Sequence, residues 1–139
     1  MFSADEKTIA ELRDLRECLA AVDHAEATAL GLALDGELNR RTPDLTGVLL
    51  KAADSAGRHG LALGRILMAA CCRAFCARLG ELHPGASIEV RVPPWAAVQV
   101  GFGDGPKHTR GTPPNVVEME PSTLLGLATG RLCWAEAEV

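Results

Sequence analysis

Apolar residues recur every three or four positions through the first 82 residues, which is the spacing of one face of an α-helix. The clearest stripe consists of Ile9, Leu12, Leu15, Leu19 and Val22. Ser3 and Glu6 stand at capping-box spacing, so we expect the first helix to begin beside them. A weaker second stripe, interrupted by Gly31 and Gly36, consists of Ala25, Ala29, Leu32, Leu34 and Leu38.

Two more helices are predicted before residue 83. Thr42-Pro43-Asp44 has the signature of a helix start, with Thr as the N-cap and Pro at the first helical position. The apolar face that follows consists of Leu45, Val48, Leu49, Ala52 and Ala53, and a break is expected at 57–60. The longest helix is predicted over 61–82. Its wide apolar surface is typical of a helix that packs both on a sheet and on other helices.

After Gly85 the periodicity changes from helical to alternating. Ile88, Val90 and Val92 share one face, which predicts a half-buried strand that ends at the following proline pair. Further strands are expected over 95–102 and 115–120, and a short helix over 123–128. This order predicts an α+β fold with N-terminal helices packed on one face of a small mixed or antiparallel sheet. The length predicts a single domain over 1–139, mainly helical over 1–82, with strands and one C-terminal helix over 86–139.

A net charge of −4 argues against a nucleic-acid partner. The segment 51–110 is nevertheless mildly basic between acidic ends. Two interpretations remain open: attraction of an anionic ligand, or an ordinary solvated surface with scattered arginines. The apolar stretch 61–79 contains Arg65, Arg73 and Arg78, so we expect no membrane span. Acidic residues also interrupt any apolar run near the N-terminus, so we expect no signal peptide. We therefore predict a cytoplasmic protein.

The five cysteines, at 18, 71, 72, 76 and 133, form no CxxC pair. A zinc site needs converging pairs of ligands, so we expect no metal and interpret these residues as buried, reduced thiols. None of the serines stands in a GxSxG context, and the GFGDG stretch at 101–105 neither opens a helix nor contains a Lys-Ser/Thr pair. The sequence therefore predicts no enzyme and no cofactor.

The densest set of polar residues on an expected loop includes His108, Arg110 and Thr112, which alternation in an extended segment places on one side. Arginine offers a planar fork of donors to a carboxylate or phosphate, so these residues, with Arg91, are our candidates for an anion or lipid-headgroup site. The alternative is structural: Arg110 pairs with a nearby glutamate and His108 donates to backbone carbonyls.

Three segments carry a family resemblance. IEVRVPP at 88–94, HTRGTPPNVVE at 108–118 and LLGLATGRL at 124–132 resemble the actinobacterial proteins called bacterial sterol-carrier orthologues. The last segment is also similar to the wider sterol-carrier-protein-2 family. The resemblance covers roughly residues 60–139. It implies a curved sheet of about five strands with helices on one face, enclosing a tunnel for sterols, acyl chains or other lipids.

From this resemblance we expect a non-catalytic domain that binds an apolar or amphipathic small molecule. The candidate cavity lining consists of Leu63, Leu67, Val90, Val98, Val100 and Met119. The same fold also serves as an accessory domain, so the alternative is an interaction protein that acts through dimerisation or docking. The family usually continues beyond the AEAEV of 135–139 into another strand, which implies an open sheet edge or an edge covered by a second copy.

Overall fold

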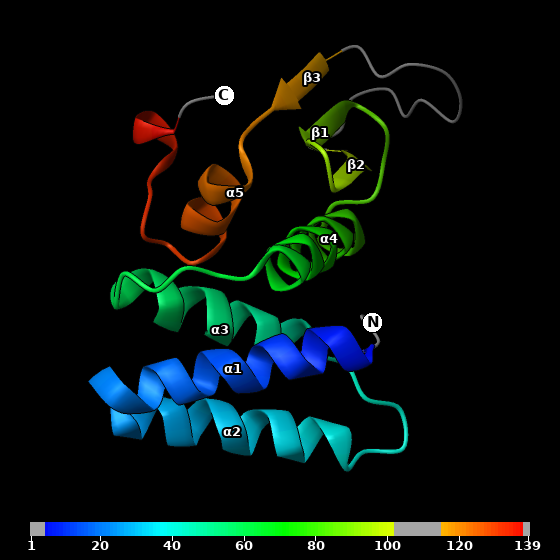
Figure 1. Ribbon diagram of the computed structural model, residues 1–139. Helices are drawn as coiled ribbons and strands as arrows, with labels where there is room; N and C mark the ends of the chain where they lie inside the picture. Colours follow the sequence, from blue (N-terminus) through cyan, green and yellow to red (C-terminus); the bar gives the residue numbers. More distant parts are fainter. Residues whose placement is uncertain (1–4, 102–114, 138–139) are drawn as a thin grey trace.

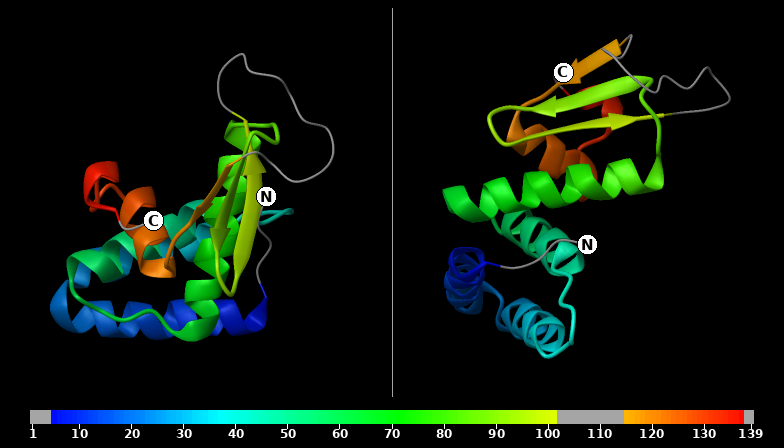
Figure 2. Two further views of the ribbon diagram at one scale, coloured as in Figure 1. Left: turned by 90° about the horizontal axis from the view of Figure 1, so that it is seen from above. Right: turned by 90° about the vertical axis from the view of Figure 1, so that its right-hand side faces the viewer.

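The computed structural model describes residues 5–101 and 115–137, and in this part of the chain five α-helices accompany a three-stranded sheet (Figure 1). The observed architecture is therefore α+β, as the sequence predicts. Helix α4 lies between the sheet and the layer formed by α1, α2 and α3 (Figure 2). The N-terminal helices thus reach the sheet through α4, which contacts β2 directly.

The first two helices share one aspartate as their junction. Helix α1 covers Glu6–Val22 and α2 covers His24–Leu38. Asp23 ends α1 and caps α2, its carboxylate accepting a hydrogen bond from Glu26 N at 3.1 Å. The N-cap of α1 is Asp5, which accepts from Thr8 N at 2.7 Å, rather than Ser3, which lies outside the described residues.

The buried face of α2 differs from the predicted stripe. Ala27, Leu30, Gly31 and Leu34 are buried, whereas Leu32 is 69% exposed. A Cβ at Gly31 would lie 2.6 Å from Arg16 Nε, so the missing side chain lets the Arg16 side chain lie against α2. The predicted stripe is wrong because Gly31, which interrupts it, belongs to the buried face.

Helix α3 covers Thr46–Arg58 and begins three residues later than predicted. Asp44 accepts hydrogen bonds from Thr46 N at 3.1 Å and Thr46 Oγ1 at 2.7 Å, which turns the chain into the helix in place of a cap by Thr42. The predicted apolar face is confirmed, since all five of its members are buried. Gly60, with φ of +65°, follows the helix end at the predicted break.

Helix α4 covers Arg65–Leu82, so the first four residues of the predicted span lead into the helix without belonging to it. Its N-cap is Gly64, which has no side chain to accept hydrogen bonds. Glu11 of α1 takes that role, because its Oε1 accepts from Leu67 N at 3.4 Å. A Cβ at position 64 would lie 1.8 Å from the same oxygen. A carboxylate from another helix therefore stabilises the positive end of α4.

The sheet has the order β2-β1-β3 among the described residues. Strand β1 covers Ile88–Val92, β2 covers Ala96–Val100 and β3 covers Asn115–Glu118. Strand β1 pairs antiparallel with β2 and parallel with β3, so the sheet is mixed. The resemblance implies about five strands, and three are found in the part of the chain that the structure describes.

Two glycines allow the chain to close around the outer ends of β1 and β2. Gly101 N donates to His83 O at 2.9 Å, which brings the end of β2 against the segment before β1. A Cβ at Gly101 would lie 2.6 Å from Pro84 O, and one at Gly85, where φ is +142°, would lie 2.7 Å from Gly101 Cα. Both positions need glycine because the obstructing atoms belong to the backbone.

The chain continues from β3 into helix α5, Pro121–Ala128, and a short 3₁₀ helix, η1, at Trp134–Glu136. Proline at the start of α5 and Gly130 just after it, with φ of +75°, bound the helix, which begins two residues before the predicted span of 123–128. Helix α5 packs against α3 and α4. The buried hydrophobic residues of the four long helices, the sheet and α5 belong to one continuous cluster.

Candidate functional site

A groove of about 490 Å³ lies between α4, the sheet and α5. Its lining is almost entirely apolar and consists of Phe75, Leu79, Ile88, Val90, Val117, Met119, Leu124, Leu127, Ala128 and Trp134. The periodicities of three elements produce this lining. Ile88 and Val90 share one face of β1, Val117 pairs with Val90 across the parallel ladder, and Leu124, Leu127 and Ala128 repeat at helical spacing.

Met119 and Trp134 complete the groove from outside the strands and α-helices. Met119 N donates to Arg91 O at 3.0 Å, which continues the pairing of β3 with β1 and holds the methionine beside the sheet. Trp134 lies on η1 and remains 61% exposed, although it lines the groove. A large aromatic ring that stays this exposed marks the open side of the groove.

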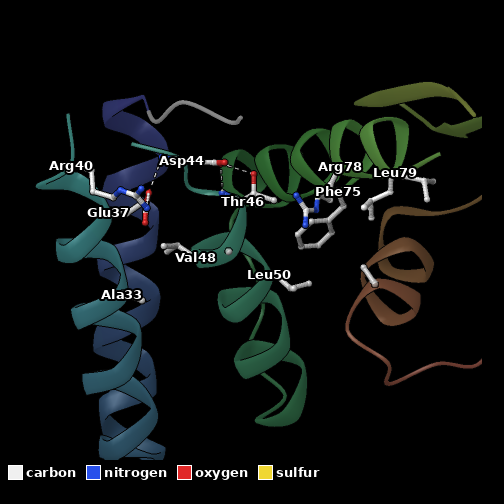
Figure 3. Close-up of a pocket in the computed structure, with 13 residues that line it drawn as sticks. Ala33, Glu37, Arg40, Asp44, Thr46, Val48, Leu50, Phe75, Arg78 and Leu79 are labelled. Carbon is white, nitrogen blue, oxygen red and sulfur yellow. Dashed lines mark hydrogen bonds and ion pairs between the residues drawn. The ribbon is translucent and has the colours of Figure 1, made fainter. Parts of the chain in front are cut away.

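A second, larger pocket of about 740 Å³ adjoins the groove (Figure 3). Its lining comes from α2, α3, α4 and the end of α5, together with the turn that precedes α3. Phe75, Leu79 and Ala128 line both cavities. The two spaces are therefore contiguous across one face of α4.

Polar groups distinguish this larger pocket from the groove. Arg40 Nη1 lies 3.4 Å from Glu37 Oε1, and the same oxygen accepts from Asp44 N at 3.1 Å. Arg78 extends from α4 into the pocket next to Phe75 (Figure 3). Among the described residues, the Arg78 guanidinium forms no hydrogen bond or ion pair. It is thus a positive charge available to an incoming anion.

The predicted anion-site residues are only partly described. His108, Arg110 and Thr112 lie outside the described residues, so their placement stays a prediction. Arg91 is exposed on β1, where its guanidinium pairs with Glu89. This hydrogen bond holds the pKa of Glu89 below its usual value. Arg91 belongs to neither of the two cavities.

Of the predicted cavity residues, Val90 and Met119 line the groove. Leu67 is buried near the start of α4, beside Glu11 and Leu61, and Leu63 lies in the segment that leads into α4. Val98 approaches Gly80 of α4, where an added Cβ would lie 2.8 Å from Val98 Cγ2, and Val100 is fully buried. The last four residues thus pack elsewhere in the core.

Sequence reasoning missed five large members of the groove: Phe75, Leu79, Leu124, Leu127 and Trp134. The spacing of Phe75 and Leu79, and that of Leu124 and Leu127, indicates one helix face in each case. No local pattern predicts that these two faces lie opposite each other, because α4 and α5 are far apart in the sequence and meet only in the folded chain.

Potential metal ligands are not gathered into one site in the part of the chain that the structure describes. Within residues 5–101 and 115–137, no group of three or more His, Cys, Asp or Glu side chains is placed to hold a metal ion. Cys71, Cys72 and Cys76 are buried in α4, whereas Cys18 and Cys133 are exposed, contrary to the expectation that all five are buried. No helix in the same part of the chain is both long and apolar enough to cross a membrane.

The fold and groove define an α+β domain with an apolar space between a small mixed sheet and its helices. The model of the family described as "Bacterial SCP ortholog" matches residues 64–139, which is more than half of the chain. The chain belongs to this family of sterol-carrier-like proteins. No curated protein matches the sequence significantly. Every residue that lines the groove lies within the matched segment, whereas the larger pocket also uses α2 and α3, which precede it.

Proposed function

We propose that this protein is a non-catalytic carrier domain that binds an apolar or amphipathic small molecule in the groove between α4, the sheet and α5. One observation carries the proposal: a space of about 490 Å³ with an almost wholly apolar lining lies inside the segment that matches the family. Small-molecule sites typically enclose roughly 300–1,000 Å³ and are mostly apolar. Burial of apolar ligand surface supplies the driving force, at about 25 cal/mol per Å².

Trp134 provides the first test, because its exposed ring lines the groove. Titration with decanol should shift the Trp134 emission to shorter wavelength as the ligand replaces water at the ring. In Trp134→Phe the shift should disappear, since the remaining Trp95 lies outside the groove. Native mass spectrometry of that variant should still show the decanol adduct.

A variant that fills the groove tests the location of the ligand. Ala128→Phe places a ring between α4 and α5 and should abolish decanol binding. Ala10→Phe, on an exposed position of α1 outside both cavities, is the matched control and should bind normally. Equal binding by both variants would place the ligand elsewhere and contradict the proposal.

Exposed apolar residues favour a second candidate function, docking to another protein. Val116 of β3 is 45% exposed and Trp134 is 61% exposed. If decanol and other aliphatic ligands leave wild-type fluorescence and mass unchanged while the protein sediments as a dimer, the interaction function replaces the carrier function.

A further inference from the structure

Three side chains on one face of α4 line the space that runs from the apolar groove to a positive charge. Phe75, Arg78 and Leu79 are spaced by three and four positions, so their side chains leave the helix on the same side. Phe75 and Leu79 line both cavities, and Arg78 lines only the larger one. The guanidinium therefore lies at the polar end of a continuous space whose other end is apolar.

The two carboxylates that line the larger pocket are already engaged by the chain itself. Glu37 interacts with Arg40 and with the backbone of Asp44, and Asp44 accepts two hydrogen bonds from Thr46. Figure 3 shows Glu37 and Arg40 on the α2 side of the pocket, away from Arg78, whereas Asp44 and Thr46 lie at the start of α3 between them and Arg78. The positive charge of Arg78 is thus not matched by a described acidic partner within the pocket.

We propose that the larger pocket is an anion subsite, in which Arg78 binds the carboxylate or phosphate head of an amphiphile whose aliphatic tail occupies the groove. The inference rests on the proposed function and narrows its ligand to an anionic amphiphile. A guanidinium fork forms two parallel hydrogen bonds with either head group. Because α2 and α3 form the opposite wall, the helices that precede the family segment take part in recognition.

The test compares three ligands with the same ten-carbon tail: decanoate, decyl phosphate and decanol. Binding is measured by calorimetry for the wild type, for Arg78→Gln and for Arg73→Gln. Arg73 is the matched control, because it is an exposed arginine of the same helix that lines neither cavity. Arg78 is exposed as well, so its replacement should leave the fold intact, which circular dichroism checks.

We expect the wild type to bind the two anions about tenfold more tightly than decanol, as one charged hydrogen-bonding group at a partly solvated site allows. Arg78→Gln should lose this preference and keep its affinity for decanol, whereas Arg73→Gln should behave as wild type. A larger loss for decyl phosphate than for decanoate would identify phosphate as the preferred head.

Two results overturn the inference, and they differ in what they imply for the carrier function. If Arg78→Gln binds both anions as tightly as the wild type does, the anion subsite is wrong but the apolar groove stands. If none of the three ligands binds the wild type, the carrier function fails, and with it the anion subsite.

Discussion

At the scale of single residues, burial separates the cysteines into two groups. Burial raises the pKa of Cys71 to about 12 and that of Cys72 to about 11, and it raises the pKa of Cys76 as well. A thiol with a raised pKa holds little thiolate at neutral pH, and the thiolate is the reactive form. Cys18 and Cys133 remain exposed.

We therefore expect two cysteines of the native protein to react quickly with iodoacetamide at pH 8 and three to react only after unfolding. Mass spectrometry of peptides labelled before and after denaturation checks this expectation. Fast labelling of Cys71 or Cys72 in the folded protein would show that α4 opens more readily than its burial indicates.

The sequence predicts some of the site residues but not others. The sequence predicts Val90 and Met119 as lining residues, because an alternating strand and a methionine beside another strand indicate an inward face. The sequence does not predict Arg78 as a site residue, since an exposed arginine on a helix has no local signal of function. Its position follows only from the packing of α4 against α3 and α5, which are separate in sequence.

At the scale of elements, hydrophobic periodicity predicts helices and strands well where one face dominates. The buried face of α3, strand β1 and helix α5 follow the expected patterns, and so does α1 except at Val22, which is 57% exposed. The start of α3 and the N-cap of α1 differ because Asp44 and Asp5 supply the polar contacts instead. Boundaries depend on individual hydrogen bonds, which the periodicity does not contain.

The closure of β1 and β2 at Gly101 leads to an element-scale prediction. Gly101→Ala should lower the free energy of unfolding by about 2 kcal/mol or more, because the new Cβ meets the Pro84 carbonyl and the Gly85 backbone. Urea denaturation followed by circular dichroism measures the loss.

Gly36→Ala is the control for this substitution. Position 36 lies in α2 with nothing within 4 Å of an added Cβ, so alanine should raise stability by about 0.5–1 kcal/mol through helix propensity. Equal effects at positions 36 and 101 would show that the two backbone segments move apart without cost.

At the scale of the whole molecule, α4 belongs to two layers. It matches the family model together with the sheet, yet it also packs against α1 and α3. The segment that follows α5 makes a similar link, since a Cβ at Gly57 of α3 would lie 1.9 Å from Arg131 Cζ. Much of the buried surface of the family segment is therefore covered by the helices that precede it.

This arrangement predicts that residues 64–139 do not fold alone. Removal of 1–63 takes away the α1 and α3 residues that cover α4, whose buried side chains are Leu67, Phe75 and a set of alanines and cysteines. Exposure of one Leu or Phe costs about 1.5–3 kcal/mol, against a typical domain stability of about 5–15 kcal/mol. We expect the full chain to unfold in one cooperative thermal transition and the fragment to show none. A cooperative transition of the fragment would contradict the prediction of a single domain over 1–139.

The contact between Glu11 and Gly64 has a consequence for how such chains diverge. The carboxylate of one helix occupies the volume that a side chain at the start of another would need. A larger side chain at position 64 would displace the flexible Glu11 side chain and remove the acceptor of Leu67 N. A chimera that takes its first helices from one relative and its sheet from another therefore keeps this cap only when it combines Glu at position 11 with Gly at position 64.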